Sequence, residues 1–407
     1  MEIIVFIGSN KSGSSREALI TSTKMGYYTI LLTNRKGFIK HKEEFPEVHE
    51  MIYEENLSDE EKIQSILSRI EKDKKKIAAV ISFIDPFVSL AARIAIGLGL
   101  VPLSTNALTI MEKKTRFREQ LKANPVTPHY SIIKSNQPIH TCVLGFLDEL
   151  PLVLKCPTSN GSKDVMLAST ISELKDSLSY LRRKYPDTSL LAEEYLEGTQ
   201  YLIEVIAFKG EITMVAVIEQ EIQQGGRFII TGYIYPAALT ETEYDKLEAA
   251  VTSVISQLEL VNGTCHLEMR LIDGEWKLIE INPRMSGGAM NRIIQEGTGI
   301  NLVKETIKLS LGEVPALEKT KTTHVYAKFL TVNTRGKLLK VTGENIASAF
   351  EGVVEVFVKP RNGAILTIPY SLGDRYAYVI ASSETTEQAK LIASTASMEI
   401  KFYLEPL

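Results

Sequence analysis

The sequence predicts an α/β protein of several domains, and three observations support that fold class. The chain has 407 residues, of which 44% are hydrophobic and 24% are charged, so it can bury a large core and should divide into about two to four domains. Residues 1–108 alternate short apolar runs with helical patterns, which is typical of an open parallel sheet. Two later runs on either side of an Asp-Gly pair alternate polar and apolar residues, which is typical of an antiparallel hairpin.

The first domain is predicted from buried strands that alternate with helices. Apolar runs predict parallel strands at Glu2–Ile7, Thr29–Thr33 and Ile77–Phe83. Helical periodicity predicts helices at Ser15–Met25, Asp59–Lys72 and Val88–Leu98. Gly8–Gly13 follows the first strand. We interpret it as a flexible turn because it lacks the glycine and lysine spacing of phosphate-binding loops, and a loop that cradles an anion is the alternative.

Later segments follow the same two periods. Strands are predicted at Leu190–Gly198, where an edge strand is the plain alternative, and at Tyr201–Phe208 and Thr213–Gln220, which a Lys-Gly turn joins. Helices are predicted within Glu112–Pro128 and at Glu241–Leu260, Asn291–Leu311 and Thr386–Ser397.

The most informative segment is the hairpin between His266 and Arg284. Because a one-residue slip turns every side chain to the opposite face, a two-residue Asp-Gly loop would leave Glu268 and Glu280 on different faces. We therefore predict an odd loop, Asp273 to Glu275, which places Glu268 opposite Glu280.

The same register places His266 opposite Asn282 on the polar face of the hairpin. Two carboxylates side by side repel each other unless a cation lies between them. A few hard oxygen ligands that leave room for water and phosphate suit Mg²⁺. For Glu268 considered alone, the alternative to a metal ligand is a solvent-exposed hairpin face whose charges have no function.

Glu280-Ile-Asn-Pro-Arg284, with Glu268 before it and Ser286-Gly-Gly after it, resembles the metal-binding signature of the ATP-grasp superfamily of carboxylate ligases. The resemblance implies that Glu268, Glu280 and Asn282 hold two Mg²⁺ ions on the phosphates of ATP, with Mn²⁺ as an alternative ion. It also implies that Arg284 stabilises the reaction centre.

The resemblance extends in order over residues 1 to about 312, and it implies an ATP-grasp fold with four domains. These are an N-terminal open parallel α/β sheet (1–108), a small lid subdomain (109–190), a central antiparallel sheet (191–319) and a C-terminal α+β segment (320–407). The last segment resembles that of the bacterial L-amino-acid ligases, which make dipeptides.

Further ATP contacts follow from the resemblance. The segment 112–128 resembles the start of the family's nucleotide-binding part, in which a lysine and a later arginine lie on a helix that ends before a proline turn. This resemblance implies that Lys114 contacts phosphate, with Lys113 as the alternative. Lys155, at the end of an apolar strand, lies where the family's ATP lysine lies, and the loop from Ser159 to Ser162 would be the lid over the phosphates. In that loop region Asp164 stands where the family commonly has Gly.

The resemblance also supplies an adenine slot. The backbone of the segment after Leu190 lines this slot in the family, so the expected hinge residues here are Glu193, Glu194, Tyr195 and Leu196. Glu204 is the candidate for the ribose hydroxyls, although Gln200 stands nearby where many relatives have Glu.

Substrate walls are the least specified part of the site. Asp85 and Pro86 follow the carboxyl end of a predicted parallel strand, where open α/β sheets bind ligands. The other candidates are Tyr233 in a glycine-rich segment, Gly287 and Gly288, which leave space for a larger side chain, and Asp374 and Arg375. For Arg375 a surface ion pair with a nearby acid is the alternative to a bound carboxylate.

The implied reaction is ATP-dependent ligation of the carboxylate of one L-amino acid to the amine of another, through an acyl phosphate, with release of ADP and phosphate. The alternatives are another ATP-grasp reaction of the purine-pathway or biotin-carboxylase type, a phosphotransferase, and a non-catalytic ATP-binding module.

Composition limits the partners. A net charge of −4 and a pI near 6.0 disfavour nucleic acid and membrane surfaces. No apolar run reaches the roughly 18 residues of a membrane span, and three isolated cysteines fit a reducing cytosol. We expect a cytoplasmic enzyme with amino acids as partners and a homodimer as one option for its assembly.

Overall fold

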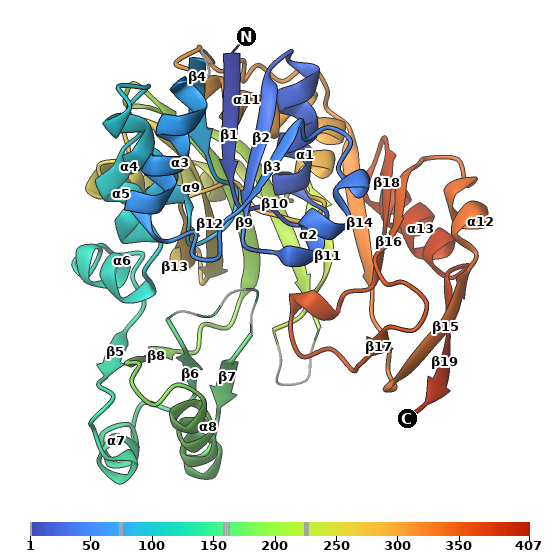
Figure 1. The fold of residues 1–407 in the computed structure, drawn as a ribbon. Coiled ribbons are helices and arrows are strands. Elements are labelled where there is room, and N and C mark those ends of the chain that lie inside the picture. The colour runs from blue at the N-terminus through green and yellow to red at the C-terminus, as the bar shows by residue number, and fades with distance from the viewer. Residues whose placement is uncertain (1, 73–75, 158, 160, 162, 224–227) are drawn as a thin grey trace.

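The computed structural model describes residues 2–72, 76–157, 159, 161, 163–223 and 228–407. Figure 1 shows a blue N-terminal domain at the top, a small domain hanging below it and a C-terminal region at the right. Within the described ranges, no helix is long and apolar enough to cross a membrane.

The N-terminal domain is a parallel sheet with strand order β3-β2-β1-β4. Its elements are β1 (Glu2–Ile7), α1 (Ser14–Lys24), β2 (Tyr28–Thr33), α2 (Lys36–Lys40), β3 (Glu50–Tyr53), α3 (Glu60–Lys72), β4 (Lys76–Ile81) and α4 (Val88–Gly97). Ile3 and Val5 pack on one side of the sheet and Ile4 and Phe6 on the other, which explains the unbroken apolar run of β1. The predicted strands and helices are confirmed, whereas β3 was not predicted.

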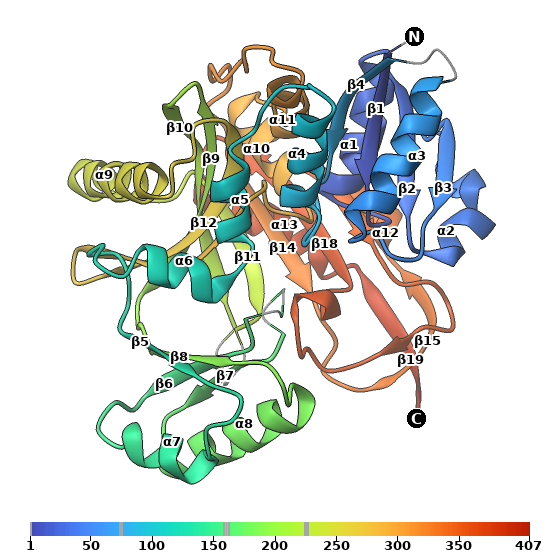
Figure 2. The same cartoon turned by 60° about the vertical axis from the view of Figure 1, so that its left-hand side comes forward.

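The small domain is an antiparallel sheet with order β5-β8-β6-β7, covered on one side by two helices (Figures 1 and 2). Its elements are β5 (Tyr130–Ile133), α7 (Ile139–Gly145), β6 (Leu152–Lys155), β7 (Val165–Ala168), α8 (Ile171–Lys184) and β8 (Leu190–Glu194). Because β8 lies between β5 and β6, the edge-strand alternative for this segment is wrong. We call this domain the lid.

The central sheet has eight antiparallel strands in the order β13-β12-β9-β10-β11-β14-β18-β16. They are β9 (Thr199–Phe208), β10 (Glu211–Ile222), β11 (Ile230–Tyr235), β12 (Gly263–Ile272), β13 (Glu275–Asn282), β14 (His324–Leu330), β16 (Val353–Val358) and β18 (Ala377–Ser383). The last three come from the C-terminal segment, so that segment continues the central sheet. The four-domain division remains a prediction.

Helices and a second small sheet complete the chain. The helices are α5 (Thr105–Met111), α6 (Lys114–Gln120), α9 (Glu241–Gln257), α10 (Met290–Thr298), α11 (Leu302–Ser310), α12 (Glu344–Ser348) and α13 (Thr386–Ser397). The sheet contains β15 (Gly336–Thr342), β17 (Ile365–Leu366) and β19 (Lys401–Pro406).

The single helix predicted at 291–311 is wrong. Gly299 has φ 83°, a left-handed conformation that ends α10. The Asn301 side chain then accepts a 3.0 Å hydrogen bond from the Lys304 backbone N–H and caps α11. Helical periodicity continues through the break because both helices pack on the same core.

Candidate active site

The hairpin of β12 and β13 has the predicted pairing, which brings its polar residues together. Glu268 lies opposite Glu280, and His266 lies opposite Asn282. β9 adds Gln200 and Glu204 to the same face, because Gln200 pairs with Arg270 and Glu204 with His266.

The predicted three-residue loop, however, is wrong. Ile272 pairs with Glu275, so the loop is the two-residue Asp273-Gly274 turn, with φ of 50° and 78°. The register shifts by one residue at Ile279, which is a β-bulge between the pairs Met269–Leu278 and Glu268–Glu280. The extra residue that brings the two carboxylates together therefore lies in the strand instead of in the loop.

Buried lysines and an amide surround the two opposed carboxylates. The Lys114 ammonium lies 3.0 Å from Glu280 Oε1 and donates to the Ser159 carbonyl at 3.0 Å. Gln200 Nε2 donates to Glu268 Oε2 at 3.0 Å. Lys114 is buried and Lys113 is exposed at the start of α6, so Lys114 is the lysine that reaches the site.

The two carboxyls are held in opposite electrostatic conditions. Burial and the neighbouring Glu280 charge raise the pKa of Glu268. Burial also acts to raise the pKa of Glu280, but the Lys114 and Lys155 cations outweigh it and lower that pKa well below its usual range. A divalent cation between the two carboxylates would remove their repulsion, and the oxygen ligands of Glu268, Glu280 and Asn282 fit Mg²⁺.

A second buried ion-pair group lies at the base of the lid. Glu193 is bound by both the Arg118 guanidinium and the Lys155 ammonium. Arg118 is fully buried and also donates to the Ile279 carbonyl at 2.8 Å, so it joins α6, the lid and the bulge of β13. Burial acts to raise the pKa of Glu193, but the two cations lower it.

Asn282 is oriented by a buried imidazole. Asn282 Nδ2 lies 3.2 Å from both Glu280 Oε1 and His266 Nε2, and His266 Nδ1 lies 2.7 Å from the Arg284 carbonyl. A neutral ring that donates through Nδ1 and accepts at Nε2 satisfies all these contacts. Burial and the Arg284 charge lower the pKa of His266 to about 4, which keeps the ring neutral.

The Arg284 side chain connects the central sheet to the N-terminal domain. Its Nε and Nη2 donate to Asp85 Oδ2 at 2.9 and 2.5 Å. Asp85 Oδ1 is buried and has no hydrogen-bond partner among the described residues. One carboxylate oxygen is thus available beside the arginine.

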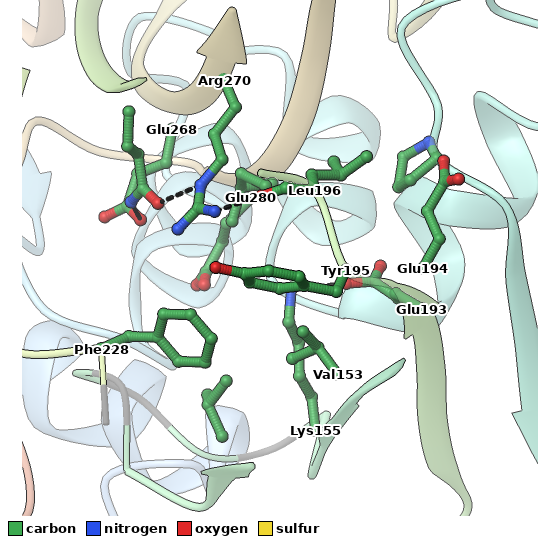
Figure 3. Close-up of a pocket in the computed structure, with 14 residues that line it drawn as sticks. Val153, Lys155, Glu193, Glu194, Tyr195, Leu196, Phe228, Glu268, Arg270 and Glu280 are labelled. Atoms are coloured by element: carbon green, nitrogen blue, oxygen red, sulfur yellow. Dashed lines mark hydrogen bonds and ion pairs between the residues drawn. The ribbon is translucent and has the colours of Figure 1, made fainter. Parts of the chain in front are cut away.

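A cleft opens between the lid and the central sheet (Figure 3). Val153, Tyr195, Phe228 and Ile279 give it flat apolar walls, while Lys155, Glu268 and Glu280 line its polar end. Glu193, Glu194 and Leu196 of the predicted hinge also line the cleft. Such a cleft fits a planar ring system joined to an anionic group.

Arg270, Gln200 and Phe228 line this cleft but were not among the predicted site residues. The Arg270 guanidinium lies 5.7 Å from the Tyr195 ring centre and 5.8 Å from that of Phe228, and it donates to the Leu196 carbonyl. A signal did exist for Arg270, because it continues the two-residue alternation of His266 and Glu268.

Glu204 does not line the cleft. It is fully buried, and its Oε1 accepts from the Ser286 backbone N–H at 2.9 Å and from the Ser286 hydroxyl. Its Oε2 has no partner among the described residues. This position supports a role in holding the loop after Arg284 and does not support the expected contact with ribose.

Asp164, which follows the predicted lid loop, anchors this part of the lid through hydrogen bonds of its side chain. This residue has φ 59°, which explains why Gly would suit the position. Its carboxylate is fully buried and accepts from Lys184, Tyr185 and Tyr370, at 2.8, 2.5 and 2.7 Å. Burial acts to raise the pKa of Asp164, but these bonds lower it to about 2.

Hydrogen bonds in this region join the lid to the C-terminal segment. Tyr370 binds Asp164 and the Tyr180 hydroxyl, and the Leu372 N–H donates to the Gly161 carbonyl at 3.1 Å. Ser162, predicted to contact ATP, lies outside the described residues.

Four of the candidate substrate residues line two separate cavities. Asp85 and Pro86 line one together with Lys113, Lys114 and Asn282. Gly288 and Arg375 line the other.

The remaining candidates line neither cavity. Gly287 is exposed, and Tyr233 is buried with its ring 5.4 Å from that of Phe329. Asp374 Oδ2 caps its own turn by accepting from the backbone N–H groups of Tyr370 and Ser371.

Two family models match the chain. A model of the ATP-grasp domain matches residues 149–292, and one of the L-amino acid ligase C-terminal domain 2 matches residues 328–405. The uncharacterized protein y4rH of Sinorhizobium fredii is 27% identical over 263 residues, which are 63% of this chain and 54% of that protein. Dapdiamide A synthase of Enterobacter agglomerans is 25% identical over 182 residues, which are 44% of this chain and 43% of the synthase.

The chain thus spans about half the length of these curated relatives. Among solved structures, an L-amino acid ligase from Bacillus licheniformis superposes with a TM-score of 0.84 at 20% identity and covers 100% of this chain and 99% of that chain. This likeness establishes a shared fold, and a fold does not by itself select a reaction.

Arg118→Met should destabilise the protein strongly, because it leaves the buried Glu193 with one cation instead of two. Breaking a buried ion pair on one side costs about 3–5 kcal/mol. Arg116→Met, at an exposed position of the same helix, is the matched control and should change stability by less than about 0.5 kcal/mol. Urea unfolding of the two variants measures the difference, and equal midpoints would contradict the assigned role.

Stability should also depend on the protonation of Glu204. Burial raises the pKa of Glu204 from 4.5 to about 7, so the folded chain holds this proton more tightly than the unfolded chain does. Stability from this group is therefore present at low pH and is lost as the pH rises from about 4.5 to about 7, with a slope of at most about 1.4 kcal/mol per pH unit. Glu204→Gln does not titrate, and thermal unfolding between pH 5 and 8 should show wild type losing stability relative to it; parallel profiles would argue against the prediction.

Proposed function

Because the chain belongs to the ATP-grasp family of ligases and carries the C-terminal domain of the L-amino acid ligases, we propose that it joins the carboxylate of one L-amino acid to the amine of another at the expense of ATP. One observation carries the proposal. The end of β13 contributes Glu280 to the cleft between lid and sheet and Asn282 to the cavity beside Asp85, so two binding spaces meet at the expected metal ligands.

The reaction needs an activated carboxylate, because oxide is too poor a leaving group for an amine to displace. Transfer of the γ-phosphoryl group of ATP to the carboxylate gives an acyl phosphate and ADP. The amine, once deprotonated, attacks the acyl carbon and expels phosphate, which forms the amide bond.

The two buried lysines suit the binding of ATP phosphates. In the structure Lys114 is paired with Glu280 and Lys155 with Glu193, so each ammonium is oriented before any anion arrives. Mg²⁺ held by Glu268, Glu280 and Asn282 would neutralise the phosphate charge. Arg284, which is bound to Asp85 of the second space, would stabilise the negative charge that develops on the transferred group.

Asp85 suits the amino group of a substrate. Its Oδ2 is bound to Arg284, and its buried Oδ1 lacks a partner among the described residues. An ammonium donor beside Oδ1 would satisfy that oxygen and place the substrate carboxylate near Arg284.

The test is phosphate release with ATP and Mg²⁺ over all pairs of the twenty amino acids, with the products identified by mass spectrometry. A dipeptide formed together with ADP and phosphate supports the proposal. ADP without free phosphate would indicate a phosphotransferase, and dependence on bicarbonate would indicate a carboxylase. No ADP with any pair would overturn the proposed reaction.

Glu280→Ala and Arg284→Ala should each reduce phosphate release by at least about 100-fold, because a charge acting on the transferred group is lost. The fold should remain intact by circular dichroism. Glu275→Ala, an exposed position on the same strand, is the matched control and should turn over like wild type. Turnover near the wild-type rate in either site variant would remove that residue from the assigned site.

A further inference from the structure

A third cavity lies where the N-terminal domain, the loop after Arg284 and the C-terminal segment meet. Its volume is about 160 Å³, which leaves room for several water molecules or a small polar group. Gly13 lines one side and Gly288 another, and these two glycines are in close contact, because a Cβ added to Gly13 would lie 2.8 Å from the Gly288 nitrogen. The remaining wall comes from β14, β16, β18 and the segments that flank them.

One wall of the cavity comes from the loop that follows Arg284. Gly288 is four residues beyond Arg284, and a Cβ added at Gly288 would meet no atom within 4 Å, so the absent side chain leaves open space there. At the opposite end Leu372 lines the cavity and bonds to Gly161 in the lid loop. The cavity is therefore lined both by the loop that follows Arg284 and by a residue that is bonded to the lid.

Two cations line the cavity, and neither has an acidic side chain within ion-pair distance among the described residues. The Lys359 ammonium donates to the Gly373 carbonyl. Arg375 donates to the carbonyls of Leu372 and Ile230, each at 3.3 Å. The alternative of a surface ion pair for Arg375 is wrong. Among the described residues, its guanidinium hydrogen-bonds to neutral backbone carbonyls and to no carboxylate.

The nearest acid, Asp374, is already engaged. Its Oδ2 accepts from the N–H groups of Tyr370 and Ser371, at 2.9 and 2.8 Å, and from the Ser371 hydroxyl. Both positive charges therefore remain available to an anion in the cavity.

Aromatic rings form much of the cavity wall and hold the Arg375 guanidinium in place. The Arg375 guanidinium lies 4.0 Å from the centre of the Phe329 ring, and the rings of Phe357 and Tyr378 stack at 5.2 Å. Partial burial of its ammonium and the nearby Arg375 charge lower the pKa of Lys359, although the residue as a whole is exposed. An incoming anion would offset the repulsion between these two cations.

The proposed reaction, on which this inference rests, offers one suitable anion. In that reaction Lys114 and Lys155 would bind the phosphates of ATP, and Arg284 would bind the reacting carboxylate. We propose that the cavity binds a second carboxylate through Lys359 and Arg375, one that is not phosphorylated. Its source is the α-carboxylate of the acceptor amino acid or the side chain of an acidic substrate, which share this chemistry.

Two matched comparisons distinguish the sources. L-alanine against L-alaninamide as acceptor tests the α-carboxylate, and L-glutamate against L-glutamine tests a side-chain carboxylate. In one comparison the carboxylate form should have a KM at least tenfold lower than the neutral form. Equal KM values in both comparisons would overturn the proposal while dipeptide formation still supported the ligase reaction.

Lys359→Met removes one charge with little change in volume. It should raise the KM of the preferred carboxylate substrate at least tenfold, with the KM for ATP changed less than twofold and the KM of the neutral analogue unchanged. Lys401→Met, at an exposed lysine of the same segment, is the control. An equal rise for the neutral analogue would show a structural effect and overturn the proposal.

Calorimetric titration separates this inference from the ligase proposal. L-glutamate and L-alanine are titrated into the protein with Mg²⁺ and ADP, which needs no turnover. Binding by wild type that weakens at least tenfold in Lys359→Met and stays unchanged in Lys401→Met supports the cavity even if no dipeptide forms. Equal binding by all three proteins overturns it.

Discussion

The neutralisation of buried carboxylates is the constraint on which the rest of the site depends. Glu193 is buried and Glu280 is mostly covered by protein, so an unpaired carboxylate at either position would be costly. Arg118 and Lys155 neutralise Glu193, and Lys114 neutralises Glu280. These ion pairs join α6, the lid and the central sheet, so the electrostatics of the site and the positions of its domains are coupled.

That coupling prepares the site for an anionic ligand. A phosphate group entering the cleft would compete with Glu193 and Glu280 for the two lysines, and the released carboxylates would need another cation. Mg²⁺ bound together with a nucleotide supplies such a charge, which explains why the same residues suit both. The bulge at Ile279 is essential to this arrangement, because it turns Glu280 to the face of Glu268 and directs its own carbonyl to Arg118.

The C-terminal segment contributes to the site in two ways. Its strands β14, β16 and β18 extend the central sheet, so strand pairing joins the segment to the sheet that carries the candidate site. Its loop around Leu372 contacts Gly161 and Asp164 in the lid through backbone and tyrosine hydrogen bonds. A change in the cavity at Lys359 and Arg375 would therefore be expected to alter these contacts with the lid.

The sequence by itself determined the local features: the buried strands of the first domain, the alternation of polar and apolar residues within each strand of the hairpin, and the family signature around Arg284. These follow from periodicities of two and 3.6 residues, which neighbouring residues set. Only the tertiary structure decided the bulge at Ile279, the break at Gly299, the burial of Asp164 and Glu204, and the partners of Arg118 and Arg375. Those outcomes depend on contacts between residues far apart in the chain, because burial decides which charges must be paired. A local sequence pattern does not predict such contacts.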